Sequence, residues 1–255
     1  MFFYGYLSLL GRLFEMVLEA VVFDLGGTLV YLDDELDRIV ADGHRALAEY
    51  LNRSGHRVGL QEVREVSVRV FDAYSVFAET SLADVDARVL YRSLLRHLGV
   101  WDFTDEFLVG AVMCFYASVT SHYVLYEDAL EVLTELRNSG LKLGMITDNS
   151  SVDSHEFILG RFGLHRFFDS ILVSSRVGVR KPHKAIFMQS LRELGVEAAD
   201  AVYVGDAPER DVVGAVNAGM KSIWVDRGDK KVGVVKPDWT VTSLRQVAQT
   251  VRTLV

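Results

Sequence analysis

Short apolar runs that stop at polar residues alternate with helical patterns along most of this chain, and no other sequence feature constrains its fold more. Five runs are rich in Val and Ile: residues 20–24, 141–147, 170–174, 201–205 and 221–226. Continuous apolar strands of this kind suit a parallel sheet that is covered on both faces. The sequence therefore predicts a doubly wound, Rossmann-like α/β sheet.

The intervening segments supply the helices that such a sheet needs. Helical periodicity is expected at residues 128–138, 152–162, 183–194 and 209–218. A last strand near residues 239–241 and a helix at 243–254 complete the core.

Residues 33–122 differ from the rest, because they contain no convincing strand, no proline and no lysine. Helical periodicity predicts four amphipathic helices, at residues 34–52, 60–79, 85–98 and 104–122. They form a bundle-like unit inserted after the first strand. Open α/β sheets bind ligands outside the carboxyl ends of their strands, so this unit is expected to act as a lid. The expected parts are an extension at 1–19, a core at 20–32 and 123–255, and a helical unit at 33–122.

Composition excludes several classes of protein and site. The net charge of −8 argues against nucleic acid as the main partner. The single cysteine, Cys114, excludes an internal disulfide and any multi-cysteine metal site. The apolar run at residues 1–10 is shorter than the roughly 20 residues of a membrane span. It also lacks the features of a signal peptide, so the chain is predicted to be cytoplasmic.

The N-terminal extension is interpreted as a packing segment, or as translated sequence upstream of a start at Met16. An amphipathic surface helix is the alternative. The apolar extension and the helical unit are the candidate surfaces for a homodimer.

Polar clusters follow the strands at the edge where ligands bind. Asp24 ends the first strand, and Asp206 and Asp211 follow a later one. Three adjacent negative charges are unfavourable unless a cation offsets them, and carboxylate oxygens suit Mg²⁺. These residues are therefore the candidate metal ligands.

The remaining clusters suit a phosphorylated ligand. Lys181 supplies a positive donor, while the Thr147 hydroxyl and loop amides can hold further oxygens. A carboxylate beside Mg²⁺ and a phosphate is placed to attack phosphorus and form an aspartyl-phosphate. The candidate phosphate-binding segments are Gly26-Gly27-Thr28 and Asp148-Asn149.

These motifs together resemble the haloacid dehalogenase-like hydrolase superfamily, in its helical-cap class. The resemblance is carried by Phe23-Asp24-Leu25-Gly26-Gly27-Thr28, by Thr147, by Arg180-Lys181-Pro182, and by Gly205-Asp206 with Asp211. Residues 202–228 are a particularly close match. The resemblance extends over residues 20–255 and implies a Mg²⁺-dependent phosphatase for a small phosphorylated metabolite.

The resemblance also implies roles for individual residues. Asp24 would be nucleophile and metal ligand, and Thr147 and Lys181 would bind the phosphoryl group. Asp206 and the backbone carbonyl of Gly26 would ligate Mg²⁺. Asp211 would support the metal site without contacting the ion directly.

The first motif departs from the family's phosphatases at Gly26, where they carry the aspartate that protonates the leaving alcohol. General acid–base catalysis contributes about 10²–10⁴-fold, so slow turnover of alkyl esters is expected. Acyl and aryl phosphates, with better leaving groups, are better candidates than sugar phosphates. Asp148, or the segment Asp33-Asp34-Glu35, is a candidate substitute acid.

Two alternative functions fit the same departure. Dehalogenases of the superfamily attack carbon without Mg²⁺ and lack the Gly-Asp pair that stands here as Gly205-Asp206. A phospho-ligand-binding protein would keep the pocket without turnover. Phosphonate-cleaving relatives use a cap lysine, which is absent here because the first lysine is Lys142.

Overall fold

The alternating strands form one parallel sheet in the computed structural model, which describes residues 18–228, 230, 231 and 233–255. Its strand order is β5-β4-β1-β6-β7-β8, and every neighbouring pair is parallel. The strands are β1 Ala20–Phe23, β4 Lys142–Thr147, β5 Ser170–Val173, β6 Ala201–Gly205, β7 Lys221–Val225 and β8 Trp239–Val241. The expected N-terminal extension lies outside the described residues, apart from Leu18 and Glu19.

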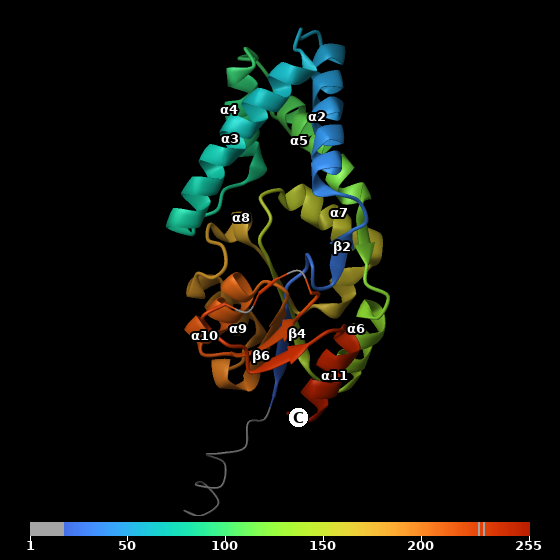
Figure 1. Cartoon of the computed structure of the whole chain (residues 1–255), viewed down its shortest axis with the longest axis vertical. Coiled ribbons are helices and arrows are strands. Elements are labelled where there is room, and N and C mark those ends of the chain that lie inside the picture. Colours follow the sequence, from blue (N-terminus) through green and yellow to red (C-terminus); the bar gives the residue numbers. More distant parts are fainter. Residues whose placement is uncertain (1–17, 229, 232) are drawn as a thin grey trace, which may run out of the picture.

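Helices cover both faces of this sheet, with α6 and α11 on one side and α9 and α10 on the other (Figure 1). Successive strand residues point to opposite faces, so Val21 packs with the first group and Val22 with the second. The helices are α6 Ala129–Asn138, α7 Val152–Phe162, α8 Ser174–Val177, α9 Lys184–Leu194, α10 Val213–Ala218 and α11 Leu244–Arg252. The predicted fold class is confirmed.

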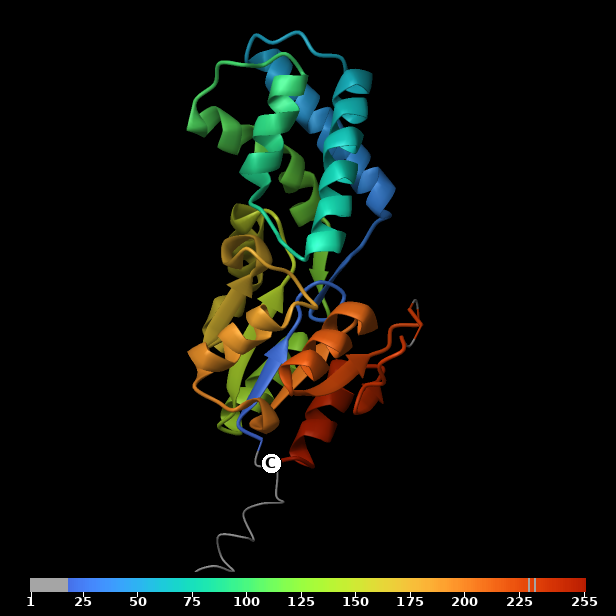
Figure 2. The ribbon, with the colours of Figure 1, turned by 90° about the vertical axis from the view of Figure 1, so that its left-hand side faces the viewer.

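A bundle of four helices, the helical unit, stacks on the carboxyl-terminal ends of the strands (Figure 2). It consists of α2 Leu36–Arg53, α3 Leu60–Ser81, α4 Ala87–His97 and α5 Asp105–Ser121. These helices bury their own apolar core, in which Leu47, Tyr91 and Leu108 are almost fully enclosed. The unit therefore has a hydrophobic core separate from those on the two faces of the sheet.

A two-stranded ribbon that the sequence analysis did not predict connects the sheet to the helical unit. It pairs β2 Val30–Leu32 with β3 Tyr123–Leu125 in antiparallel register. Strands of three residues are too short to show the alternation of apolar and polar residues by which strands are recognised.

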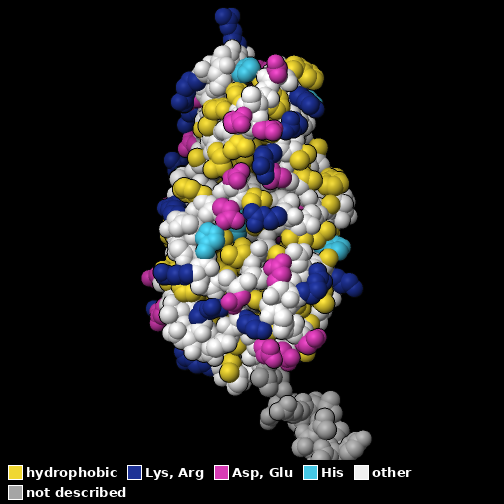
Figure 3. Space-filling view, turned by 180° about the vertical axis from the view of Figure 1, so that it is seen from behind, with side chains coloured by type: hydrophobic (Ala, Val, Ile, Leu, Met, Phe, Trp, Pro, Cys, Tyr) yellow, Lys and Arg dark blue, Asp and Glu magenta, His cyan; other side chains and the backbone are white. Residues whose placement is uncertain are grey.

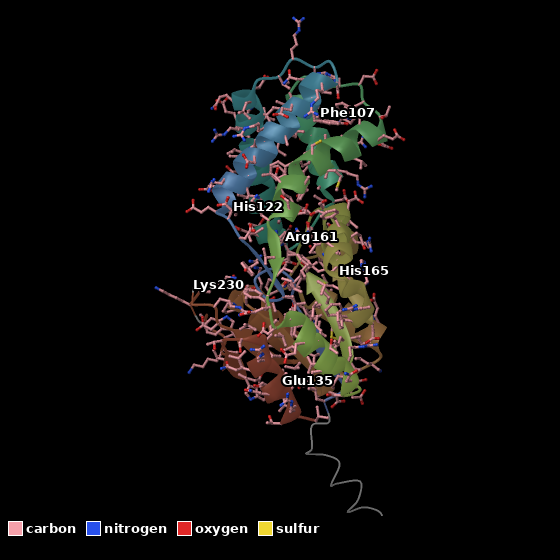
Figure 4. All side chains as sticks on the ribbon, turned by 90° about the vertical axis from the view of Figure 1, so that its right-hand side faces the viewer. Phe107, His122, Glu135, Arg161, His165 and Lys230 are labelled. Carbon is pink, nitrogen blue, oxygen red and sulfur yellow. The ribbon has the colours of Figure 1, made fainter. Side chains whose placement is uncertain are left out.

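The two connections between ribbon and helical unit lie side by side. The backbone N–H of Asp33 donates to the carbonyl of His122 over 3.0 Å, and the two side chains pair at 2.8 Å. Arg161 of α7 donates to the carbonyls of Thr120 and Ser121, at the end of α5. Figure 4 labels His122 and Arg161 at this junction. Both chain connections between the helical unit and the core therefore lie at one narrow hinge.

Charged side chains of both signs are interspersed on the face shown in Figure 3. Exposed apolar side chains also occur on the helical unit, Val76, Phe77 and Val89 among them. Among the described residues, no helix has the length and apolar character needed to cross a membrane.

His155, on α7, is a buried histidine whose ring nitrogens have no hydrogen-bond partner among the described residues. Burial lowers its pKa from 6.5 to about 4, with Glu156 opposing the shift and His165 and Arg176 adding to it. On acidification below pH 6.5, the unfolded chain binds a proton that the folded protein does not bind until about pH 4.

We therefore expect acid to destabilise the protein through His155. The free energy of unfolding should fall by about 2 kcal/mol between pH 7 and pH 5 from this group alone. Urea unfolding at pH 7 and pH 5 measures this change in the free energy of unfolding. The His155→Leu variant should lack the part of the pH dependence that comes from His155. The exposed His97→Leu variant is the control and should behave as the wild type; equal slopes in all three proteins would contradict the assignment.

Candidate active site

A small cavity opens where β1 and β6 end, and it gathers segments that lie far apart in the sequence. Its volume is about 100 Å³. It is lined by Asp24, Gly26, Asp148, Lys181, Asp206, Ala207, Arg210, Asp211 and Lys230. Each of the four sequence motifs contributes to this lining. The second motif does so through Asp148, because Thr147 itself does not line the cavity.

Three carboxylates meet in the cavity. Asp24, Asp206 and Asp211 are all buried, and one oxygen from each lies within 4.8 Å of the others. Asp24 directly follows β1, and Asp206 directly follows β6. Asp211 lies in a π-helical segment, Pro208–Val212, rather than in the regular helix predicted for residues 209–218.

Two glycines permit this close approach. A Cβ on Gly205 would lie 2.2 Å from Oδ2 of Asp211, and a Cβ on Gly27 would lie 2.3 Å from Oδ2 of Asp206. Gly27 also has a φ of +81°, in the left-handed region that favours glycine. In contrast, a Cβ on Gly26 would meet no atom within 4 Å. The first motif therefore requires glycine at Gly27, whereas Gly26 has room for a side chain.

Lys181 lies between two of the carboxylates. Its Nζ donates to Oδ1 of Asp24 over 2.6 Å, to Oδ1 of Asp211 over 2.7 Å and to the Tyr203 hydroxyl over 3.1 Å. Burial alone would lower the pKa of Lys181, but Asp211 and Asp24 raise it well above its usual value. Lys181 is therefore a fixed positive charge at the centre of the site.

Asp24 is a carboxyl group under opposing influences. Burial raises its pKa to about 7, Lys181 opposes that shift, and Asp211 and Asp206 add to it. Thr28 donates its hydroxyl to the second oxygen of Asp24 over 3.2 Å. Burial away from water thus raises the free energy of the charged carboxylate. A further cation nearby would offset this cost.

The cavity fits a divalent cation of the hard type. Its donors are carboxylate oxygens, which Mg²⁺ prefers, and they converge from two neighbouring strand ends. Asp206 in addition pairs with Lys230, which Figure 4 labels in the segment after β7. The convergence of three buried carboxylates within 4.8 Å is the observation that fits Asp24 and Asp206 to a metal.

The two predicted phosphate-binding residues of the second motif, Asp148 and Asn149, have different surroundings. Asp148 lines the cavity and accepts the backbone N–H of Lys181 over 3.1 Å, while its Oδ2 has no hydrogen-bond partner among the described residues. Burial raises the pKa of Asp148, and Lys181 opposes the shift. The Asn149 side chain instead accepts the N–H of Ser151 over 2.8 Å and helps to form the turn before α7.

Two further predicted groups lie outside the cavity lining. Thr147 is buried as the last residue of β4, beside β1. Asp33 pairs with His122 at the hinge, and Asp34 pairs with Arg38 at the start of α2. The structure therefore favours an acidic helix start over a catalytic role for the segment at 33–35, and only Asp148 of the two candidate acids reaches the cavity.

The sequence analysis missed three residues of the site: Tyr203, Arg210 and Lys230. Arg210 follows β6 in the same loop as Asp206 and Asp211, so its position after a strand could have identified it. Tyr203 is indistinguishable from any aromatic residue in an apolar strand, and Lys230 has no sequence signal.

The loop between α3 and α4 connects the helical unit to the strand-end loops. Asp84, which is buried in this loop, accepts the hydroxyl of Tyr74 and that of Ser174, the latter over 2.5 Å. Its backbone N–H donates to Gly178, and Arg180 donates in return to Leu82 over 2.9 Å. The loop thus contacts the segment that carries Lys181.

We expect Asp84→Ala to weaken this contact. Loss of a buried hydrogen-bonded carboxylate leaves hydroxyl donors unpaired, which costs about 1–3 kcal/mol in the free energy of unfolding. Small-angle scattering should also show a larger radius of gyration as the helical unit separates from the core. Asp72→Ala, on the exposed face of α3, is the matched control; indistinguishable scattering from both variants would argue against the contact.

Comparisons with known proteins agree with this geometry. Glyceraldehyde 3-phosphate phosphatase of Methanopyrus kandleri is 33% identical over 166 residues, which are 63% of this chain and 70% of that protein. Phosphoserine phosphatase of Thermus thermophilus is 38% identical over 126 residues, 49% of this chain and 50% of that protein. The chain thus spans only about half the length of the second relative.

A solved structure and a family description cover more of the chain. The crystal structure of 2-haloacid dehalogenase from Pseudomonas syringae superposes with a TM-score of 0.70 at 25% identity, covering 94% of this chain and 100% of that one. Residues 18–219 match the model of the haloacid dehalogenase-like hydrolases. Together with the strand-end carboxylates, this match shows that the chain belongs to the haloacid dehalogenase-like hydrolase family.

Proposed function

We propose that the protein is a Mg²⁺-dependent phosphatase that acts on a small phosphorylated metabolite through Asp24. The observation that carries the proposal is the meeting of three carboxylates and Lys181 around a cavity of about 100 Å³. Pockets that hold whole small-molecule ligands have volumes of about 300–1,000 Å³, so this smaller cavity suits a phosphoryl group rather than a whole metabolite. Curated relatives that are named phosphatases support the same assignment.

The chain's own groups account for most of the reaction. A carboxylate oxygen of Asp24 attacks phosphorus, forming an aspartyl-phosphate and releasing the alcohol, and water then hydrolyses that intermediate. Lys181 donates to the phosphoryl oxygens, and the loop amides after β1 and β4 hold the remaining oxygens. Thr147 is proposed to contribute its hydroxyl from the end of β4, directly before Asp148 of the cavity lining. Mg²⁺, held by Asp24, Asp206 and the Gly26 carbonyl with support from Asp211, would offset the charge of the phosphoryl group.

The first motif provides no acid to protonate the leaving group, because Gly26 has no side chain. We propose that Asp148 is the substitute acid, since its buried Oδ2 lines the cavity without a hydrogen-bond partner among the described residues. The helical unit, corresponding to the proposed lid at residues 33–122, would exclude water when it closes over the bound ester.

Metal removal is the first test of this function. Chelation should lower kcat/KM for acetyl phosphate and p-nitrophenyl phosphate by about 100-fold or more, and Mg²⁺ should restore it, because such ions supply several kcal/mol of charge stabilisation. Mg²⁺ should also raise the thermal midpoint of the wild type but not that of Asp206→Asn. Full activity after chelation would contradict the proposal.

The same measurements separate the two alternatives. Release of halide from 2-haloacids without metal would identify a dehalogenase, the activity for which the Pseudomonas syringae protein is named. Tight binding of phosphate or beryllium fluoride without repeated turnover would identify a phospho-ligand-binding protein. The Gly205-Asp206 pair, with its carboxylate in the cavity, favours the phosphatase.

A further inference from the structure

A second and larger pocket adjoins the cavity of Asp24. Its volume is about 390 Å³, and it shares Lys181 and Arg210 with that cavity. The end of α3 contributes Ala78, and the loop after it contributes Leu82, while Pro182 lies on the opposite wall. A substrate whose phosphoryl group lies against Asp24 would therefore place the rest of its structure in this pocket.

Two arginines line this pocket, and neither guanidinium group has a hydrogen-bonded partner in the part of the chain that the structure describes. The Arg180 side chain has neither a hydrogen bond nor an ion pair among the described residues, although its backbone N–H is fixed by the Leu82 carbonyl at 2.9 Å. Among the carboxylates of the described residues, Arg210 is within ion-pair distance of Asp148, at 4.0 Å, and of Glu209, at 3.8 Å. Both distances exceed a hydrogen bond, so these planar donors are available to a ligand.

The charge around the pocket favours an anion of single charge. Lys181 contacts Asp24 and Asp211 and is assigned to the phosphoryl group, so Arg180 and Arg210 are the cations of this lining that remain for the rest of the substrate. Glu79 and Glu209 are exposed at the rim and would repel a dianion more strongly than a monoanion. A carboxylate carries one charge and matches the fork of an arginine with two parallel hydrogen bonds.

We propose that Arg180 and Arg210 form a carboxylate subsite, and that the substrates are phosphorylated carboxylic acids. This inference rests on the proposed phosphatase function, because it places the phosphoryl group at Asp24. The two arginines bind the carboxylate a few bonds away from the reacting phosphorus. Each charge-assisted pair of hydrogen bonds should change the preference for such a substrate by about ten- to hundred-fold.

The test compares two esters that differ only in the group that the subsite binds. 3-Phosphoglycerate carries a carboxylate where glycerol 3-phosphate carries a hydroxymethyl group. We expect the ratio of their kcat/KM values to favour 3-phosphoglycerate by about ten-fold or more in the wild type. Arg180→Gln should lower that ratio by at least about ten-fold, and Arg210→Gln should lower it in the same direction.

Arg192→Gln provides the matched control, because Arg192 lies on α9 and lines a different pocket. It should keep the wild-type ratio. Thermal midpoints verify that the Arg180 variant folds normally. A ratio near one in the wild type, or a ratio that Arg180→Gln leaves unchanged, would overturn the subsite. Faster turnover of propane-1,3-diol bisphosphate than of 3-phosphoglycerate would overturn the assignment of a carboxylate.

Failure of the subsite can be distinguished from failure of the phosphatase function. If acetyl phosphate is hydrolysed but the two esters show no difference, the subsite fails and the phosphatase function stands. If no phosphate compound is hydrolysed, calorimetry with Mg²⁺ still compares the binding of 3-phosphoglycerate and glycerol 3-phosphate to the wild type. Tighter binding of 3-phosphoglycerate that is lost in Arg180→Gln supports the subsite, and equal binding overturns it.

Discussion

Asp24→Asn should reduce the turnover of every phosphate ester by about 10⁴-fold or more, the scale at which enzymes lose activity with their nucleophile. The amide has the shape of the carboxylate but cannot attack phosphorus to form a phosphorylated side chain. The fold should survive, because the amide oxygen can still accept the Thr28 hydroxyl. Steady-state kinetics with acetyl phosphate measures the effect.

Asp153→Asn serves as the control for this substitution, since Asp153 is an exposed acid in the first turn of α7. It should retain wild-type kinetics. If Asp24→Asn kept more than a small fraction of the activity, Asp24 would not be the nucleophile. Mass spectrometry of the wild type quenched during turnover should detect a phosphorylated peptide that contains Asp24.

Gly26→Asp should act in the opposite direction and raise kcat for alkyl phosphates, by about 100-fold where proton transfer limits the rate. Gly26 lines the cavity, has no positive φ, and would present a Cβ to open space. The new carboxyl group can therefore protonate the departing alcohol. Aryl phosphates should gain little, because their leaving groups need no proton.

Gly26→Asn is the matched control, with the same shape but no proton to transfer. It should leave the rate for alkyl phosphates near that of the wild type. Equal rates in all three proteins would show that leaving-group protonation does not limit this enzyme.

The role of Asp148 as the acid can be tested in two proteins, the wild type and the Gly26→Asp variant. Asp148→Asn should slow alkyl ester turnover in the wild type, where Asp148 is the proposed acid. In Gly26→Asp it should have a smaller effect, because a second acid is then present. Equal losses in both backgrounds would assign Asp148 a structural role through its bond to the Lys181 backbone.

Local signals made much of the core predictable. The helix at residues 152–162 was predicted with its observed bounds, because Ser151 caps its start and Gly163 ends it in the left-handed conformation. The position of Asp24 and Asp206 followed from a general property of parallel sheets, whose carboxyl ends meet at one edge. Residue type and strand register were sufficient for both.

Other features depend on contacts that the sequence does not encode locally. Asn149 has the residue type of a phosphate ligand, but its amide oxygen accepts the Ser151 N–H and the residue does not line the cavity. The pocket of Arg180 and Arg210 also includes the end of α3, a segment distant in the sequence. No periodicity or motif links these parts, so only their packing shows the pocket.

The ribbon of β2 and β3 has an evolutionary consequence. The chain leaves the sheet and returns to it through neighbouring strands, so the two ends of the inserted bundle lie side by side at one place. A foreign insert with similarly spaced ends could be grafted there while the reacting groups kept their places. Replacement of the inserted bundle at this position would change the substrate specificity of related proteins and leave the catalytic residues in place.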